Sequence, residues 1–114
     1  MMSVWKYAIP QPLMDRFTVV MPEGAKVLCI QLQYGRPCLW ALVDAAAKVE
    51  ERRFYIVVTG HDADGVENMT YIGTFQTAED LVLHVFEAVK IKLVDVTTHS
   101  DAGPRFEPYQ PVKL

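Results

Sequence analysis

The side chains that could take part in chemistry are spread along the chain, and few fall close together. His61 follows Thr59 and Gly60, and precedes Asp62 and Asp64. An imidazole at a strand end beside carboxylates suits a general base or a metal ligand. Metal sites need three or four converging ligands, and the sequence has no His-x-His or Cys-x-x-Cys spacing. We therefore predict no metal site and no cofactor, and favour a surface or hydrogen-bonded His61 over a catalytic one.

A charged run, Glu50-Glu51-Arg52-Arg53, is the second group of reactive side chains. Two guanidinium groups side by side can bind phosphate through paired hydrogen bonds. The adjacent carboxylates favour a solvated edge in which these charges pair with one another. Anion binding by Arg52 and Arg53 remains the alternative.

Trp40 is the aromatic side chain with the clearest binding potential. It shares one face of a predicted hairpin with Gln31 and Gln33, while Arg36 lies at the turn. An exposed Trp40 would be an anchor for a partner. The alternative, which we favour, is that a second sheet covers this face and buries Trp40. The candidate ligand-binding or partner-binding residues are Gln31, Gln33, Arg36, Trp40, Arg52, Arg53 and His61.

No catalytic residue is predicted. Cys38 would need a neighbouring base to act as a nucleophile, and no Cys–His pair can be read from the chain. His84 lies in an apolar run, where a histidine is usually satisfied by a hydrogen bond. Gly-rich phosphate loops, nucleophile elbows and HExxH motifs are missing from the sequence. An enzyme is therefore the least favoured class of function.

Composition indicates one globular domain without a membrane span. The chain has 114 residues, of which 51% are hydrophobic and 22% charged. Its net charge of −3 argues against binding to nucleic acid. No apolar run reaches the roughly 18 residues of a membrane span, and no secretion signal is visible at the N-terminus. With only Cys29 and Cys38 as thiols, we expect a cytoplasmic protein.

Short runs of β-branched and aromatic residues, separated by Pro, Gly and Asp, predict a mostly β chain. The expected strands cover residues 4–9, 17–21, 26–34, 37–44, 53–59, 71–76 and 81–87. The fold class is all-β, with six to eight short antiparallel strands in a sandwich or small barrel and one or two short helical turns. An exposed edge strand or the C-terminal tail would mediate a homo-oligomer.

The clearest element is the hairpin over residues 26–44. Gly35 and Arg36 fit a two-residue type II′ turn, which pairs Leu32 with Leu39. In this register Cys38 lies four positions from Cys29, so the two sulfurs are roughly 13 Å apart and cannot form a disulfide. One face is then apolar throughout, consisting of Leu28, Ile30, Leu32, Tyr34, Pro37, Leu39, Ala41 and Val43.

Three other segments are less clear. Residues 77–90 fit either a helix, with Thr77 in a capping position, or a strand, and we favour the strand. Residues 45–51 fit a helical turn or a connection, and residues 91–97 could form a last strand. We assign residues 1–99 to one β domain. Residues 100–114, which are rich in proline, are assigned to an extended tail whose Phe106 and Tyr109 can dock on the domain or on a partner.

Six segments within residues 4–87 form a recognisable series, and in chain order they read VWKY, PEGAKVL, GRPCLWALVD, TGH, YIGTFQ and LVLHVFE. Together these segments resemble a family of short, uncharacterised proteins of bacteriophages, prophages and their hosts. The family has no established activity, so the resemblance implies a phage origin and no mechanism. The chain departs from the family pattern at Glu79-Asp80, where glycine is expected, and residues 88–114 look like an extension.

These observations favour a small phage-encoded binding protein that contacts a host or phage macromolecule in the bacterial cytoplasm. One alternative is a small-ligand protein that sequesters a nucleotide-like signal, with Arg36, Trp40, Arg52, Arg53 and His61 as its binding groups. A virion-associated structural protein is another.

Overall fold

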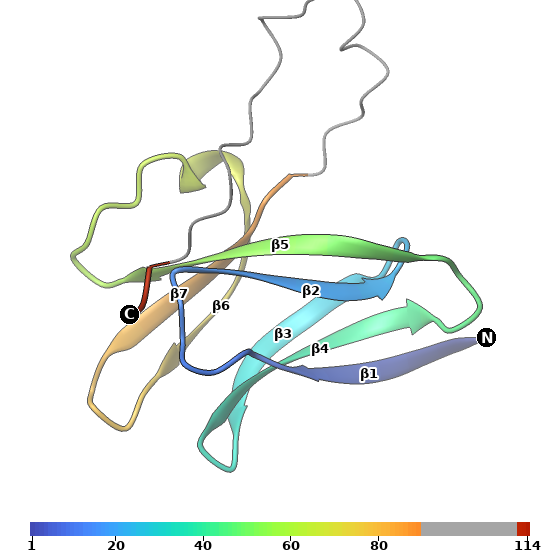
Figure 1. The fold of residues 1–114 in the computed structure, drawn as a ribbon, viewed down its shortest axis with the longest axis horizontal. Coiled ribbons are helices and arrows are strands. Elements are labelled where there is room, and N and C mark those ends of the chain that lie inside the picture. The colour runs from blue at the N-terminus through green and yellow to red at the C-terminus, as the bar shows by residue number, and fades with distance from the viewer. Residues whose placement is uncertain (90–111) are drawn as a thin grey trace, which may run out of the picture.

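The computed structural model describes residues 1–89 and 112–114, which form two antiparallel sheets packed face to face (Figure 1). One sheet has three strands in the order β1-β4-β3, and the other has four in the order β2-β5-β7-β6. The strands are β1 (Met2–Ala8), β2 (Arg16–Pro22), β3 (Lys26–Gln33), β4 (Arg36–Asp44), β5 (Val49–Val58), β6 (Thr70–Gln76) and β7 (Val82–Glu87). The prediction of an all-β sandwich is confirmed, and each of the seven expected strands is present.

The ambiguous segment 77–90 contains strand β7 and no helix up to Val89. Thr77 does not cap a helix, because its hydroxyl accepts a hydrogen bond from the Leu81 amide at 3.2 Å and its own amide donates to the Leu81 carbonyl at 2.8 Å. Asp80 has a φ of 64° inside this tight turn. Thr77 therefore closes the β6–β7 hairpin, in keeping with the favoured strand.

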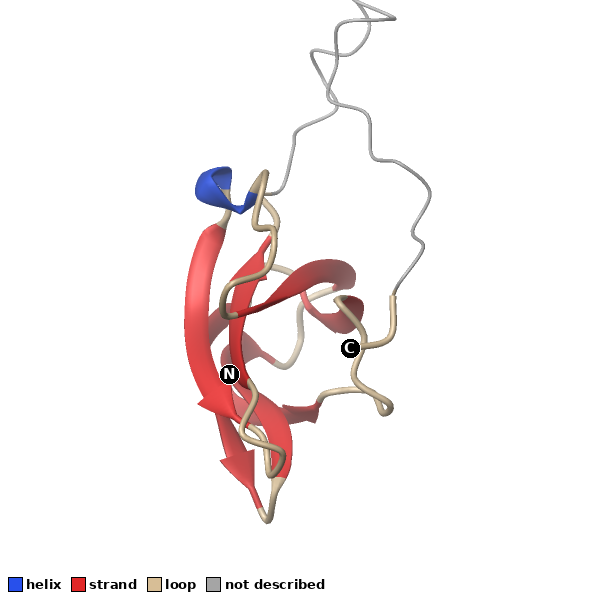
Figure 2. Ribbon diagram, turned by 90° about the vertical axis from the view of Figure 1, so that its left-hand side faces the viewer, coloured by secondary structure: helices blue, strands red, loops and turns tan. Residues whose placement is uncertain are grey.

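The segment 45–51 is also non-helical. Asp44 Oδ1 accepts a hydrogen bond from the Ala46 amide at 3.0 Å, which forms a turn, and β5 begins at Val49. Helical geometry among the described residues is limited to a 3₁₀ turn at Val66–Asn68, visible as the short helix in Figure 2. The expected strand over 91–97 and most of the expected tail lie outside the described residues. At the C-terminus, Lys113 forms a bridge with Met14.

The turn and register predicted for the 26–44 hairpin are wrong. Tyr34 and Gly35 form the two-residue loop, with φ of 52° and 76°, which fits a type I′ turn. Leu32 therefore pairs with Pro37, and Ile30 pairs with Leu39. This is a shift of two positions, and because side chains alternate with a period of two, the inward and outward faces are unchanged. A bulge between Val27 and Cys29 then leaves Leu28 47% exposed instead of in the core.

The new register also corrects the argument about the cysteines. Cys38 lies opposite Gln31, and Cys29 lies opposite Trp40. The two cysteines are thus diagonal neighbours, with Cα atoms about 7–8 Å apart, rather than four positions apart. Both are free thiols in the structure, Cys38 buried and Cys29 partly exposed.

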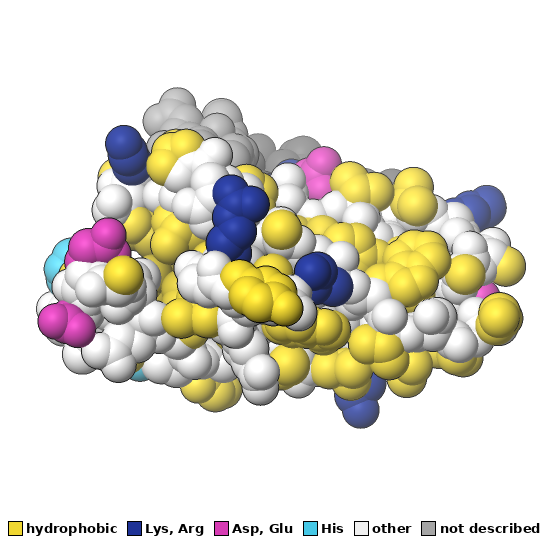
Figure 3. Space-filling model, turned by 90° about the horizontal axis from the view of Figure 1, so that it is seen from below, with side chains coloured by type: hydrophobic (Ala, Val, Ile, Leu, Met, Phe, Trp, Pro, Cys, Tyr) yellow, Lys and Arg dark blue, Asp and Glu magenta, His cyan; other side chains and the backbone are white. Residues whose placement is uncertain are grey.

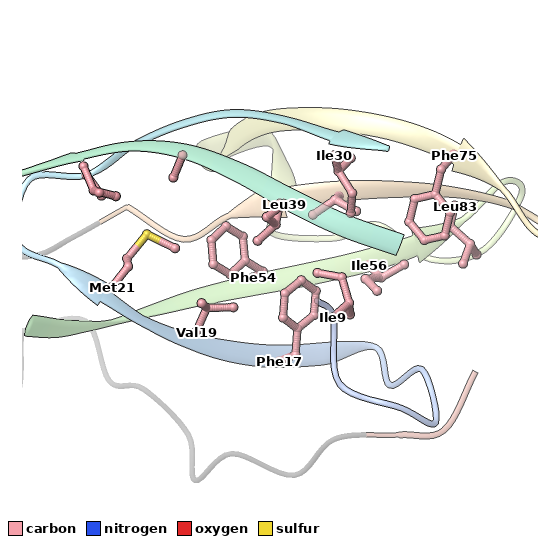
Figure 4. Close-up of a cluster of buried hydrophobic side chains, with 14 residues drawn as sticks. Ile9, Phe17, Val19, Met21, Ile30, Leu39, Phe54, Ile56, Phe75 and Leu83 are labelled. Carbon is pink, nitrogen blue, oxygen red and sulfur yellow. The ribbon is translucent and has the colours of Figure 1, made fainter. Parts of the chain in front are cut away.

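The core lies between the two sheets (Figure 4). Phe17 and Phe54 stack at its centre with ring centroids 5.1 Å apart. Leu39, from the three-stranded sheet, and Leu83, from the four-stranded sheet, are both completely buried. The other buried members are Ile9, Val19, Met21, Ala25, Ile30, Ala41, Val43, Ile56, Phe75 and Val85. The centre of the inner face of the three-stranded sheet is therefore used for packing, whereas Trp5 and Leu32 on the same face are each 40% exposed.

Candidate functional site

The outer face of the three-stranded sheet carries four of the residues predicted to bind a ligand or partner. Antiparallel pairing places them in adjacent rows across β1, β4 and β3. We call this surface the Trp40 face, and it consists of Val4, Lys6, Cys29, Gln31, Gln33, Arg36, Cys38, Trp40 and Leu42. The shared face of Gln31, Gln33, Arg36 and Trp40 follows from the alternation of side chains, which the shift in register did not change.

The second sheet packs on the opposite side, so the favoured prediction that it buries the Trp40 face is wrong. Leu39, Ala41 and Val43 of β4 point into the core, whereas Trp40 and Leu42 point outward and are half-buried. Val4, their neighbour on β1, is 53% exposed. Sequence could not decide which side is covered, because β4 is apolar on both.

Polar groups border the apolar centre of the Trp40 face. Lys6 Nζ donates a hydrogen bond of 2.6 Å to Gln33 Oε1. Since Lys6 is level with Trp40 and Gln33 is level with Arg36, this bond crosses the row that contains Cys38. Cys38 is 3% exposed, and its thiol donates to the Arg36 carbonyl at 3.6 Å, so it is a structural thiol rather than a reactive one.

Arg52 lies elsewhere, on the inner side of the four-stranded sheet. Its guanidinium pairs with both carboxylate oxygens of Glu87, lies 3.5 Å from Glu50 Oε2, and donates to the Ala25 carbonyl at 2.7 Å. The hydrogen bond with Glu87 raises the pKa of Arg52, against the opposing effect of burial. Glu50 also accepts the Gly24 amide at 3.1 Å. With all of these contacts Arg52 joins β5 and β7 of the four-stranded sheet to the turn between β2 and β3.

Arg53 and His61 are also apart from the Trp40 face. Arg53 is on the outer side of β5, 3.9 Å from a carboxylate oxygen of Glu51. His61 is exposed in the loop after β5, and its backbone amide donates to the Val58 carbonyl at 3.0 Å. The seven candidates thus divide into one surface of four residues and three separate positions.

The outer face of the four-stranded sheet holds a polar network that sequence reasoning missed. His84 Nδ1 is 2.9 Å from Thr74 Oγ1, and its Nε2 is 2.7 Å from Thr59 Oγ1. Tyr71 OH lies 2.6 Å from Thr74 Oγ1, and the Thr59 hydroxyl donates to the Val82 carbonyl at 3.3 Å. Each group can donate to the next in the order Tyr71, Thr74, His84, Thr59 and the Val82 carbonyl, if the imidazole carries its N–H on Nε2. Every group in the network then has a hydrogen-bond partner. The network therefore has a structural explanation.

Aromatic side chains flank this network. Tyr71 packs against Phe86 with centroids 5.6 Å apart, and the Arg16 guanidinium lies 5.3 Å from the Tyr55 ring centre. These contacts depend on the pairing of β2, β5, β7 and β6, which no local sequence signal reveals.

A shallow cleft of about 390 Å³ lies at the tip of the β3–β4 hairpin. Arg36 and Glu79 supply its charged groups, and Thr77 supplies a hydroxyl. The other lining residues are Gln11, Leu13, Leu32, Gly35, Pro37, Phe75 and Ala78. Histidine and cysteine are not among the residues that line the cleft.

Residues 1–89 and 112–114 contain no group of three or more His, Cys, Asp or Glu side chains that could hold a metal ion. In the same residues no helix is long and apolar enough to cross a membrane.

Comparison with known proteins identifies the family of the chain. No curated protein and no solved structure matches it. A family model matches residues 1–93, which extends beyond Glu87, where the resemblance visible in the sequence ends. The chain therefore belongs to the family described as Domain of unknown function (DUF7352).

Proposed function

We propose that this chain is a small binding protein whose Trp40 face docks on a protein partner. The observation that carries the proposal is the arrangement of this face, which has an apolar centre of Val4, Trp40 and Leu42. Polar side chains surround that centre, among them Lys6 and Gln31. An apolar centre with an aromatic anchor and a polar rim is the usual anatomy of a protein interface.

Charge favours a protein over a nucleic acid as the partner. The chain has 14 acidic and 11 basic residues, whereas binding to a phosphate backbone calls for a basic surface. The resemblance to phage and prophage proteins supports a phage-encoded protein that meets its partner, of host or phage origin, in the bacterial cytoplasm. Contact, rather than catalysis, is the expected mode of action.

Affinity capture from a lysate of the bacterial host, followed by calorimetry with the identified partner, tests this proposal. We expect Trp40→Ser to weaken binding at least tenfold, because aromatic anchors contribute most of the energy of an interface. Gln31→Lys, at an exposed position of the same face, should also weaken binding without loss of folding.

Val20→Ser is the matched control, since Val20 is 56% exposed on the four-stranded sheet and lies away from the Trp40 face. Thermal unfolding of each variant shows whether weaker binding comes from the changed surface or from a destabilised fold. Equal affinity of the partner for the native chain, Trp40→Ser and Gln31→Lys would refute the proposal, as would the recovery of no specific partner.

A further inference from the structure

β1 is an edge strand of the three-stranded sheet, and its outer edge is unpaired within the described structure. The Met1 carbonyl accepts a hydrogen bond from the Ala45 amide, and the Ile9 amide donates one to the Pro37 carbonyl. The backbone N–H and C=O groups of the odd-numbered residues of β1 therefore point toward β4. The backbone N–H and C=O groups of the even-numbered residues therefore point away from the sheet. The residues with these outward-pointing groups are Met2, Val4, Lys6 and Ala8.

Apolar side chains accompany this open backbone. Met2 is 59% exposed, Val4 is 53% exposed and Trp5 is 40% exposed. Seen from the side where β1 lies, hydrophobic side chains gather along this edge (Figure 3). The strand has no proline and no bulge, and Lys6 is its single charged residue, so it has few of the usual features that keep an edge strand from pairing.

We propose that β1 pairs antiparallel with β1 of a second copy of this chain, with the two Val4 residues opposite each other. The two three-stranded sheets then form one continuous six-stranded sheet. Met2 of each copy lies opposite Lys6 of the other, and roughly six backbone hydrogen bonds satisfy the outward-pointing groups. This inference concerns the edge of the sheet and does not rest on the proposed function, although Val4 and Lys6 also belong to the Trp40 face.

Side chains on both faces of the strand support this partner and register. Lys6 of the second copy comes into the row of Met2 and Asp44, about 10 Å from Asp44 between Cα atoms, which an extended lysine can span. The Asp44 carboxylate is 48% exposed and accessible to it. The two Lys6 residues lie about 14 Å apart, so their repulsion is small.

On the opposite face of the new sheet, Trp5 lies opposite Ser3 of the second copy, and that small side chain leaves room for the indole. Each exposed apolar residue of β1 is thereby covered by a residue of the other copy.

Two cysteine variants test the pairing directly. In this register the two Val4 Cα atoms are about 5.5 Å apart, within the range of a disulfide, whereas the two Met2 Cα atoms are about 14 Å apart. We expect Val4→Cys to give a covalent dimer on mild oxidation. Met2→Cys, at a similarly exposed position of the same strand, and the native chain with its own two thiols should remain uncross-linked.

Light scattering after size exclusion gives the second measurement. The native full-length chain should have the mass of a dimer at tens of micromolar. Val4→Lys, which brings two ammonium groups together at the centre of the contact, should have the mass of a monomer and still unfold in one cooperative thermal transition, at a midpoint that no longer depends on protein concentration. A monomeric native chain would overturn the proposal, and so would cross-linking of Met2→Cys in place of Val4→Cys.

Discussion

The edge strands on the two long sides of the sandwich are arranged differently. On the side of β3 and β6 both edge strands are bulged, and the two strands pack against each other. Gly73 of β6 lies so close to Ile30 of β3 that an added Cβ would be 2.9 Å from Ile30 Cγ2. On the other side, β1 is unbulged and its edge is open. The comparison indicates that the β3 and β6 edges cover each other, whereas the edge of β1 is left unpaired within the described structure.

The two sides also differ in whether their buried polar groups have hydrogen-bond partners. Near β3, Arg52 has partners for its guanidinium from Glu50, Glu87 and the Ala25 carbonyl. On β1, the buried hydroxyl of Tyr7 has no hydrogen-bond partner among the residues that the structure describes. Buried polar groups stabilise a fold only when they are satisfied, so the β1 side contributes less to stability.

The largest expected loss of stability follows from removing the Arg52 guanidinium from its contacts with Glu50 and Glu87. Arg52→Met removes the guanidinium that lies against the carboxylates of Glu50 and Glu87, whose side chains are both 13% exposed. We expect a loss of about 2–4 kcal/mol in the free energy of unfolding, somewhat less than for a fully buried pair. Chemical denaturation measures it. Arg53→Met is the matched control, with an expected loss below about 1 kcal/mol because its side chain is 40% exposed. Equal losses in the two variants would contradict the assigned role of Arg52.

The next effect is that of separating β3 from β6. Gly73→Ala should cost about 1–3 kcal/mol, because the new methyl group overlaps Ile30 Cγ2. Leucine has no Cγ2 branch at Cβ, so Ile30→Leu should recover part of this loss in the double variant. Denaturation of the two single variants and the double variant gives the coupling energy. Strictly additive losses would show that the two strands do not limit each other's approach.

The smallest expected effect is on the β1 side. Burial raises the pKa of Tyr7, and its hydroxyl has no hydrogen-bond partner within the described part of the chain. Tyr7→Phe should therefore leave the free energy of unfolding unchanged or raise it by up to about 1 kcal/mol, since removing an unsatisfied buried hydroxyl costs nothing. Thermal unfolding at neutral pH checks this result. A clear loss of stability would mean that the hydroxyl has a partner in solution, and the contrast between the two sides would weaken.

Local sequence was sufficient for the strands and for the orientation of their side chains. Runs of β-branched and aromatic residues bounded by turn residues located all seven strands to within a few residues. Alternation predicted one shared apolar face, of which Ile30, Pro37, Leu39, Ala41 and Val43 are buried, whereas Leu28, Leu32 and Tyr34 of the same predicted face are exposed. It also placed Gln31, Gln33 and Trp40 together on the opposite side. These features depend only on neighbours along one strand or across one hairpin.

Tertiary structure decided the features that depend on distant segments. Arg52 meets Glu87, 35 residues away, because β5 pairs with β7. The hairpin turns at Tyr34 and Gly35 rather than at Gly35 and Arg36, a choice that leaves the faces unchanged and so has no signature in hydrophobicity. The covered face of β4 was likewise ambiguous, because both of its faces are apolar and only the position of the second sheet distinguishes them.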